Sequence, residues 1–230
     1  SVRAPLDEAL CRAAWQAQGK LKFYYLPHNC GIEYALNTGL EAIVAAGYEF
    51  VARLDCDDLC VSDRIARQMA FLDQYPEVYL LGSAVTFFDA SGDRFTLNQP
   101  QTHEQIVQQM HKDNAFTHPS VMFRTAGVRE IGLYPLDCKA AEDFAYFWAF
   151  VARYQTANLF EVLTRSEYND SGISMSRRRQ QQAMRIKILA RYFDWRPQSM
   201  LNMGKAAASF ALPVSFTRKI KRLLGVGTWN

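Results

Sequence analysis

The chain has 230 residues, which is enough for one large α/β domain with an appendage but short for two full domains. Hydrophobic residues make up 49% and charged residues 21% of the sequence, and no tract rich in Gly, Pro or Ser occurs, which excludes a disordered or fibrous protein. A transmembrane helix is not expected, because no run of about eighteen apolar residues occurs. The first residues are typical of an amphipathic helix rather than of a signal peptide.

The net charge of +3 conceals an asymmetry between the two parts of the chain. Residues 177–230 carry 12 Lys and Arg residues against the single acid Asp194, a net charge of +11, whereas residues 1–176 carry a net charge of −8. We therefore expect an acidic domain over 1–165 and a basic helical extension over 166–230. The five cysteines are odd in number and scattered, which favours the reducing cytoplasm, including the cytoplasmic face of a membrane, over a disulfide framework.

The acidic part alternates helix and strand signals, read from apolar periodicity and from Gly, Pro and capping residues. The predicted elements are, in chain order, a helix at 5–18, a strand at 21–26, a helix at 32–46, a strand at 49–54, a helix from 62 to 75, strands at 78–81 and 84–88, a return strand at 94–97, a helix at 102–112, a strand at 120–123, a helix at 142–154 and a strand at 159–163. Strands separated by helices predict an α/β fold with a mostly parallel sheet covered by helices on both faces. The hairpin around residues 89–92 supplies an antiparallel edge.

Three carboxylates follow the predicted strand at 49–54. Asp55 and Asp57 lie two positions apart, so an extended chain would aim both at one site, and Asp58 follows directly. The carboxyl ends of strands border the ligand crevice of open α/β sheets. Hard oxygen ligands favour Mg²⁺ or Mn²⁺ bridging a diphosphate. The alternative is a turn whose acids cap the next helix.

The order and spacing of several motifs resemble those of the family 2 glycosyltransferases, which have the GT-A fold. The motifs are Asn29-Cys30-Gly31, Ala35–Leu40, Phe50–Asp58, Asp63-Arg64-Ile65 with Gln68, Leu81-Gly82-Ser83, His118–Arg124, Gly132-Leu133-Tyr134 and Ala141-Glu142-Asp143. The resemblance covers most of residues 1–176. It implies a GT-A-like, Rossmann-like fold and an inverting transfer of a sugar from a nucleotide-sugar donor to a hydroxyl group of a saccharide or lipid-linked acceptor, in polysaccharide or glycolipid biosynthesis.

The resemblance assigns roles to two acidic motifs. Asp55-Cys56-Asp57 corresponds to the family's DxD motif, which implies that Asp57 binds Mg²⁺ or Mn²⁺ and that Asp55 contacts the metal or the nucleotide ribose. Glu142-Asp143 corresponds to the ED motif, which implies a catalytic site with Asp143 as the general base. The alternative for Asp143 is a purely structural one, in which the dipole of the following helix favours an acid in its first turn.

Four further residues are candidates for binding the nucleotide-sugar, each with a structural alternative. Asn29 and Asn37 lie in family motifs, but Asn beside Gly is also ordinary turn chemistry. Arg64 can pair with phosphate or with the acids, or it is a solvated helix residue. His118 can face the diphosphate or the acceptor, or it is a structural histidine with two hydrogen bonds.

The basic extension has two interpretations. Its Lys and Arg residues, interleaved with apolar ones such as Met184 and Ile188, suit a helix that associates peripherally with anionic lipid. Alternatively, a helical hairpin packs on the acidic domain and satisfies its charge there. Nucleic-acid binding is not expected, because no known module accompanies the basic residues.

Compared with the family pattern, the sequence lacks two strands upstream of Ser1, so we expect an N-terminally incomplete domain whose predicted strands at 21–26 and 49–54 lose neighbours. Two rival functions follow from the same residues. One is a non-catalytic fragment that binds a membrane or a partner through its basic tail. The other is a Mg²⁺-dependent phosphotransferase with Asp55 as the nucleophile.

Overall fold

A computed structural model describes residues 7–16, 19–168 and 178–211 of the chain. Its centre is a six-stranded sheet in the order β1-β5-β3-β6-β2, with β4 paired to β3. The strands are β1 (Phe50–Ala52), β2 (Leu59–Cys60), β3 (Val78–Asp89), β4 (Gly92–Leu97), β5 (Met122–Arg124) and β6 (Gln155–Glu167).

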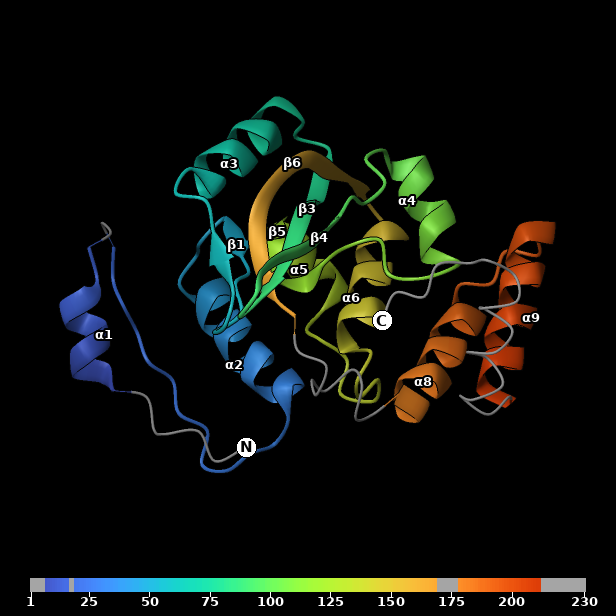
Figure 1. Ribbon diagram of the computed structural model, residues 1–230, viewed down its shortest axis with the longest axis horizontal. Helices are drawn as coiled ribbons and strands as arrows, with labels where there is room; N and C mark the ends of the chain where they lie inside the picture. Colours follow the sequence, from blue (N-terminus) through green and yellow to red (C-terminus); the bar gives the residue numbers. More distant parts are fainter. Residues whose placement is uncertain (1–6, 17–18, 169–177, 212–230) are drawn as a thin grey trace.

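Helices surround the sheet (Figure 1). They are α1 (Glu8–Ala14), α2 (Ile32–Ala45), α3 (Arg64–Gln74), α4 (His103–Met110), the short 3₁₀ helix η1 (His118–Ser120), α5 (Thr125–Ile131), α6 (Glu142–Val151), α8 (Arg178–Arg191) and α9 (Pro197–Ala211). The positions of α2, α3, α4 and α6 agree with the sequence, whereas α5 and the two-residue β2 were not predicted. The strands expected at 78–81 and 84–88 form one continuous strand, β3.

The expectation that the strands pair mostly in parallel is wrong, although the predicted alternation of helices and strands is confirmed. Only β3 and β6 pair in parallel among the described strands, and the pairs β1–β5, β3–β5, β3–β4 and β2–β6 are antiparallel. Because β5 lies antiparallel between β1 and β3, the strands β1, β3 and β6 still share one direction. The sequence predicts that shared direction, but it does not reveal that a reversed strand is inserted between two of its members.

The strand predicted at 21–26 is also absent, since these residues pair with no described strand. Their aromatic side chains contact α1 instead. Tyr25 donates a hydrogen bond to Glu8 at 2.8 Å, and the Arg12 guanidinium lies 4.9 Å from the centre of the Phe23 ring. Alternating aromatics are typical of strands, but a strand needs a neighbour to pair its backbone groups. In Figure 1, α1 and this segment lie apart from the sheet.

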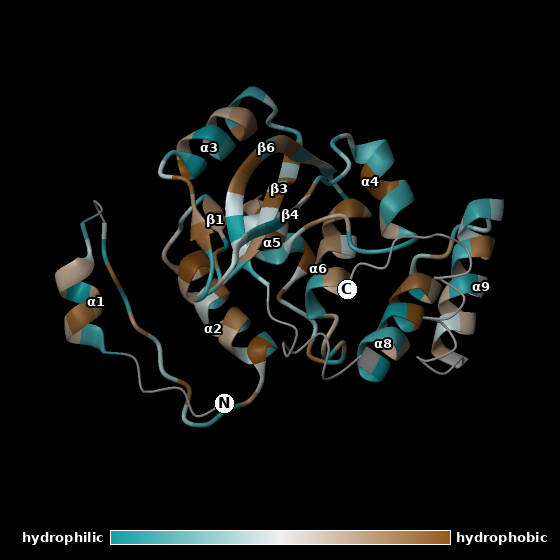
Figure 2. Cartoon of the chain, in the orientation of Figure 1, coloured by the Kyte–Doolittle hydropathy of each residue, from teal (hydrophilic) through white to brown (hydrophobic). Residues whose placement is uncertain are grey.

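The core occupies both faces of the sheet. The larger cluster contains Leu80 and the aromatic face of α6, and the smaller one contains Leu81 with Leu72 of α3. Consecutive residues of β3 thus serve opposite faces, as the alternation of a strand requires. Figure 2 shows hydrophobic strands at the centre and hydrophilic outer turns on α3 and α4, which is the pattern of surface helices.

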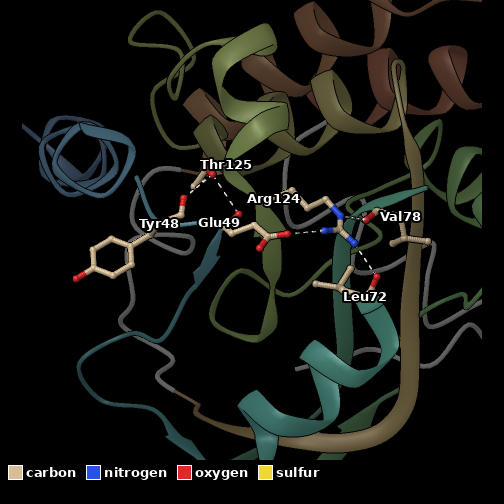
Figure 3. A network of polar contacts seen from close by, with 6 residues as sticks. All are labelled: Tyr48, Glu49, Leu72, Val78, Arg124 and Thr125. Atoms are coloured by element: carbon tan, nitrogen blue, oxygen red, sulfur yellow. Dashed lines mark hydrogen bonds and ion pairs between the residues drawn. The ribbon is translucent and has the colours of Figure 1, made fainter. Parts of the chain in front are cut away.

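Arg124 fixes the end of the sheet where β1 begins (Figure 3). It donates hydrogen bonds to the carbonyls of Leu72 at 2.6 Å and Val78 at 3.0 Å, which joins the end of α3 to the start of β3. The next residue, Thr125, donates to the carbonyl of Tyr48 at 2.6 Å. These contacts hold the start of β1 in place. The acidic motif Asp55–Asp58 follows the other end of the strand.

The helices α8 and α9 pack on the acidic domain. Ile188 and Leu189 of α8 are buried in the larger core cluster, and Tyr192 stacks on Trp148 of α6 with ring centres 4.7 Å apart. Of the extension's charges, Lys187 pairs with Asp137 at 2.6 Å and Arg185 with Asp113 at 3.6 Å. For residues 178–211 these contacts favour the packed hairpin over a lipid-facing helix.

None of the described helices combines the length and apolar character needed to cross a membrane. The Lys and Arg residues of the extension at 218–222, to which the lipid interpretation also applies, lie outside the described residues. The strand β6 continues to Glu167, slightly beyond the boundary expected after residue 165.

Candidate functional site

The acidic motif lies where β1 ends beside the start of β5. The Arg53 amide donates to the Val121 carbonyl at 2.9 Å, which brings η1 with His118 to the same edge of the sheet as Asp55. After this contact the chain turns, because the Asp58 amide donates to the Asp55 carbonyl at 3.2 Å. The expectation of an extended chain through the acids is therefore wrong. The strand ends at Ala52, and a tight turn displays the carboxylates.

The three carboxylates of this turn have different surroundings. Asp55 forms an ion pair with Arg53 at 2.6 Å, and Asp57 is exposed. Asp58 accepts a hydrogen bond from the Glu167 amide at 3.0 Å, which ties the turn to the end of β6. Partial burial raises the pKa of Asp58, against the lowering effect of its hydrogen bonds to Ser166 and Glu167. Asp58 thus holds the turn, whereas Asp57 is exposed and the Asp55 side chain is 38% exposed. The part of the turn that carries these two carboxylates is called the open side below.

The donor set of this turn suits a hard cation that is shared with a ligand. No group of three or more His, Cys, Asp or Glu side chains within metal-binding distance occurs among the described residues. Mg²⁺ usually binds one or two protein carboxylates together with substrate phosphates rather than an all-protein cage. Asp57 and Asp55 therefore fit a divalent cation whose remaining ligands come from a diphosphate.

The second acidic motif begins helix α6. Glu142 and Asp143 occupy its first turn, where the helix dipole favours negative charge. Ala140, just before them, has a φ of +67°, a conformation that costs a non-glycine residue free energy and often marks functional sites. Burial raises the pKa of Asp143, opposed by hydrogen bonds from the amides of Phe144 and Asp143 itself and from Asn114. A carboxylate whose pKa is raised is a stronger base once ionised.

Glu142 is buried beside a second buried acid. Its Oε2 atom has no hydrogen-bond partner among the described residues. Burial raises the pKa of Glu142, and the nearby carboxylates of Asp143 and Glu33 raise it further. Glu33 lies in the first turn of α2 and is 4% exposed. Glu142 and Asp143 therefore have different surroundings, because Asp143 lines a cavity and Glu142 packs against α2.

Asn114 positions the Asp143 carboxylate, a role that the sequence did not reveal. Its Nδ2 donates to Asp143 Oδ2 at 3.0 Å, and its Oδ1 accepts from the Phe116 amide at 3.2 Å. The second bond fixes which end of the amide faces Asp143. The two residues are 29 positions apart, and no periodicity links them. The only signal available was the break of the helix before Asn114.

Tyr134 connects the two acidic motifs. The carboxylates of Asp143, Asp55 and Glu142 all lie near enough to raise the pKa of its buried hydroxyl, although burial is the main cause. That hydroxyl lies 3.1 Å from Nε2 of His118. Burial, with the positive charge of Arg53, lowers the pKa of His118 to about 3, so its imidazole is neutral. The hydrogen bond to Tyr134 agrees with the structural alternative for this histidine.

The two candidate asparagines have structural partners. Asn37 is buried in α2, where its Nδ2 donates to the Tyr134 carbonyl at 2.9 Å and its Oδ1 accepts from the Tyr134 amide at 2.8 Å. This pair of bonds holds Tyr134 beside the motifs. Asn29 Oδ1 accepts from the Gly31 amide at 3.1 Å, which is the turn chemistry expected of Asn near Gly.

Arg64 is buried, which neither interpretation of the sequence anticipated. It is 1% exposed and donates to Gln68 Oε1 at 2.9 Å and to the Arg53 carbonyl at 2.7 Å. A further bond reaches the Val121 carbonyl at 3.3 Å. Desolvation lowers its pKa. Arg64 therefore binds the backbone beneath the acidic turn, and it is not the solvated helix residue of the alternative.

Two cavities open beside these motifs, one for each acid. A groove of about 520 Å³ between α2 and β1 is lined by Asp55, Arg53 and Tyr134. A cavity of about 390 Å³, which shares no lining residue with this groove, is lined by Asp143 and Asn114 and by residues of α8 and α9. Asp55 and Asp143 therefore line two separate cavities.

Comparison with known proteins decides the family. Residues 7–132 match the profile of Glycosyl transferase family 2. The chain belongs to this family. It is 34% identical over 132 residues to the amylovoran biosynthesis glycosyltransferase AmsE of Erwinia amylovora, in an alignment covering 56% of this chain and 48% of that protein. It is 31% identical over 160 residues to an uncharacterized glycosyltransferase of Haemophilus influenzae, covering 68% of this chain and 58% of that protein.

The chain spans about half the length of these curated relatives. Among solved structures it resembles TarS 1–349 of S. aureus with a TM-score of 0.55 and 17% sequence identity, covering 88% of this chain and 57% of that one. At this identity the likeness bears on the fold alone. It confirms the GT-A type of α/β fold expected from the motifs.

Proposed function

We propose that this family 2 chain transfers a sugar from a nucleotide-diphosphate sugar to a hydroxyl group, with inversion at the anomeric carbon and with a divalent cation. The observation that carries the proposal is the Asp143 carboxylate, held at a helix start by Asn114 and lining a cavity. Inversion needs one base opposite the leaving group and no protein nucleophile. The cavity with Asp143 suits an acceptor, and the separate groove with Asp55 suits a donor.

In the proposed reaction the acceptor hydroxyl gives its proton to the Asp143 carboxylate. Its oxygen forms a bond to the anomeric carbon of the donor, and the bond from that carbon to the phosphate oxygen breaks. The electron pair of the broken bond leaves with the nucleoside diphosphate. The raised pKa of Asp143 suits it to take this proton.

Asp57 and Asp55 would hold Mg²⁺ or Mn²⁺, which when bound neutralises the charge of the diphosphate. Arg53, which pairs with Asp55 at 2.6 Å, would lie beside the bound cation and diphosphate. Arg64 and Asn37, expected from the sequence to bind the donor, are not assigned that role, because both side chains already bind backbone groups. One relative is named for amylovoran biosynthesis, which supports an acceptor in a polysaccharide pathway.

The experiment titrates the 230-residue chain with UDP, GDP and TDP by calorimetry, with and without Mn²⁺. We expect binding of at least one diphosphate that depends on Mn²⁺ and is lost in Asp57→Ala, because that carboxylate is exposed on the open side of the turn. The matched control is Asp73→Ala, which removes an exposed acid of α3. Binding that survives Asp57→Ala would contradict the metal assignment. Capture of a phosphoryl group on Asp55 would support the phosphotransferase instead.

A further inference from the structure

The extension forms a wall of the cavity that contains the proposed base. Besides Asp143 and Asn114, the cavity is lined by Gln181, Gln182 and Arg185 of α8 and by Ser209 of α9. The acidic domain therefore supplies one side of this cavity and the basic hairpin the other.

The hairpin wall is held in place by packing and by charge. Ile188 and Leu189 are buried in the core, so α8 is part of the domain at this point. Gln182 Nε2 donates to Ser209 Oγ at 3.2 Å, which joins α8 to α9 at the cavity. Arg185 Nη1 lies 3.6 Å from Asp113 Oδ2, which joins α8 to the loop that precedes Asn114. The spacing across the cavity is thus set before a ligand binds.

The chemistry of the lining suits a ligand rich in hydroxyl groups. Amides, a hydroxyl, a carboxylate and a guanidinium can each donate to or accept from the hydroxyls of a sugar ring. The Nε atom of Arg185 is buried and has no hydrogen-bond partner within the part of the chain that the structure describes. Because this atom has almost no accessible surface, a ligand in the cavity would contact the exposed part of the Arg185 side chain, which is 33% exposed. The cavity volume of about 390 Å³ lies within the roughly 300–1,000 Å³ typical of small-molecule sites.

The charges of the lining disfavour an anionic ligand. Among the described lining residues, the carboxylates of Asp143 and Asp113 accompany one guanidinium, that of Arg185, whose charge is already paired with Asp113. A carboxylate or phosphate on the ligand would therefore face Asp143 without an unpaired cation from this described part of the lining. A neutral sugar carries no such charge, and one of its hydroxyls can lie against Asp143.

We propose that the α8–α9 hairpin forms the acceptor subsite, in which Gln181, Gln182 and Arg185 bind a neutral pyranoside so that one of its hydroxyls meets Asp143. This inference rests on the proposed function for the role of Asp143, but the binding itself does not depend on a donor. The basic extension thus has a second purpose besides neutralising the acidic domain. Gln182 and Arg185 are specificity residues, because they contact the sugar away from the reacting hydroxyl.

The test measures saturation-transfer NMR on the 230-residue chain with the methyl pyranosides of glucose, galactose and mannose as probes, without nucleotide. We expect saturation transfer to at least one probe, reduced at least fivefold in Gln182→Ala and in Arg185→Lys. The lysine keeps the positive charge next to Asp113 and removes the planar, forked donors of the guanidinium. The matched control is Gln180→Ala, an exposed residue of the same helix, which should leave the signal unchanged.

The outcomes separate the subsite from the proposed function. No saturation transfer to any probe, or a signal that survives Arg185→Lys, would overturn the subsite. A lower melting temperature would show that Gln182→Ala loosens the hairpin. In that case the result for Arg185→Lys tests the subsite, because this variant leaves the Gln182–Ser209 bond in place. Binding of Mn²⁺ with a nucleoside diphosphate should be unchanged in both variants. If that binding fails in the parent chain while the pyranoside binds, the donor chemistry is refuted and the subsite stands.

Discussion

The two acidic motifs of this protein are built in different ways. Asp143 is partly buried at a helix start, and its carboxylate is fixed by Asn114. Asp57 is exposed on a turn beyond the end of a three-residue strand, and its neighbour Asp55 is paired with Arg53. A base must be oriented before the reaction, whereas a shared cation can be positioned by the diphosphate it accompanies. The Asp143 side is therefore preformed, whereas in the proposed function the side with Asp55 and Asp57 would be completed by its ligand.

Removing the preformed carboxylate tests this contrast most severely. We expect Asp143→Asn to lower the rate of sugar transfer by about 10²–10⁴-fold, the usual contribution of a general base. Binding of Mn²⁺ and nucleoside diphosphate should not change, because the carboxylates of the other motif remain. Transfer assays and calorimetry on the same preparations provide the two measurements.

The stability of the same variant distinguishes a base from a structural acid. The pKa of Asp143 is raised in the folded state, so its contribution to stability is present below the ordinary aspartate pKa and is lost as the pH rises through the raised value. At a pH above the raised pKa the ionised carboxylate therefore costs folding free energy, and Asp143→Asn should melt no lower than the parent at that pH. A large loss of stability with transfer intact would show that Asp143 is structural.

The open side depends on a buried residue beneath it, Arg64. We expect Arg64→Met to destabilise the fold by about 3 kcal/mol, because the carbonyls of Arg53 and Val121 would lose a buried donor. Binding of Mn²⁺ and nucleoside diphosphate should weaken as well, since Arg53 leads into the acidic turn. Denaturant unfolding measures the first effect and calorimetry the second.

The control for this prediction lies one helical turn further along. Arg67 is exposed and forms an ion pair with Asp63 at 2.7 Å on the surface of the same helix. Exposed pairs contribute about 0–1 kcal/mol, so Arg67→Met should change stability little. Equal effects of the two substitutions would contradict the supporting role of Arg64.

Gly31, at the start of α2, leaves room for Glu33, which lies beside Glu142 on the preformed side. The φ of Gly31 is +109°, and an added Cβ would lie 2.6 Å from Oε2 of Glu33, the buried acid beside Glu142. We expect Gly31→Ala to cost about 1–3 kcal/mol, because the backbone conformation and the contact both oppose a side chain. Gly39→Ala, in the same helix with nothing within 4 Å of the added Cβ, should instead stabilise by about 0.4–1 kcal/mol.

The same contrast explains what the sequence could predict. Short motifs identified the two acidic motifs and the family, because the chemistry requires particular residues at fixed spacing. Helices such as α2, α3 and α6 were predicted from apolar periodicity. Strand partners were not predictable in this way. The aromatic alternation at 21–26 is that of a strand, yet these residues pack on α1. Nor did any local signal show that β5 separates β1 from β3.

The sequence also did not reveal hydrogen-bond partners that lie far apart along the chain. Arg64 lies one turn after the acids and looked like a phosphate ligand or a surface residue, but its partners Arg53 and Val121 are brought together only by the sheet. Asn37 meets Tyr134 across 97 positions. Polar residues of this kind have no periodicity, so their burial is visible only in the folded chain.

The smallest predicted effect concerns Asn114, which distinguishes a positioned base from one that is merely present. Its hydrogen bond lowers the pKa of Asp143, so removing it in Asn114→Ala should raise that pKa further. The base must be ionised to accept a proton, and the acidic limb of the pH profile for transfer should therefore move to higher pH. On the pH plateau the rate should fall by less than about tenfold, because the carboxylate remains. Asp113→Ala, which removes the neighbouring carboxylate whose charge raises the pKa of Asp143, should move the same limb to lower pH. A limb that shifts in the same direction in both variants would mean that Asp143 is not the group that titrates.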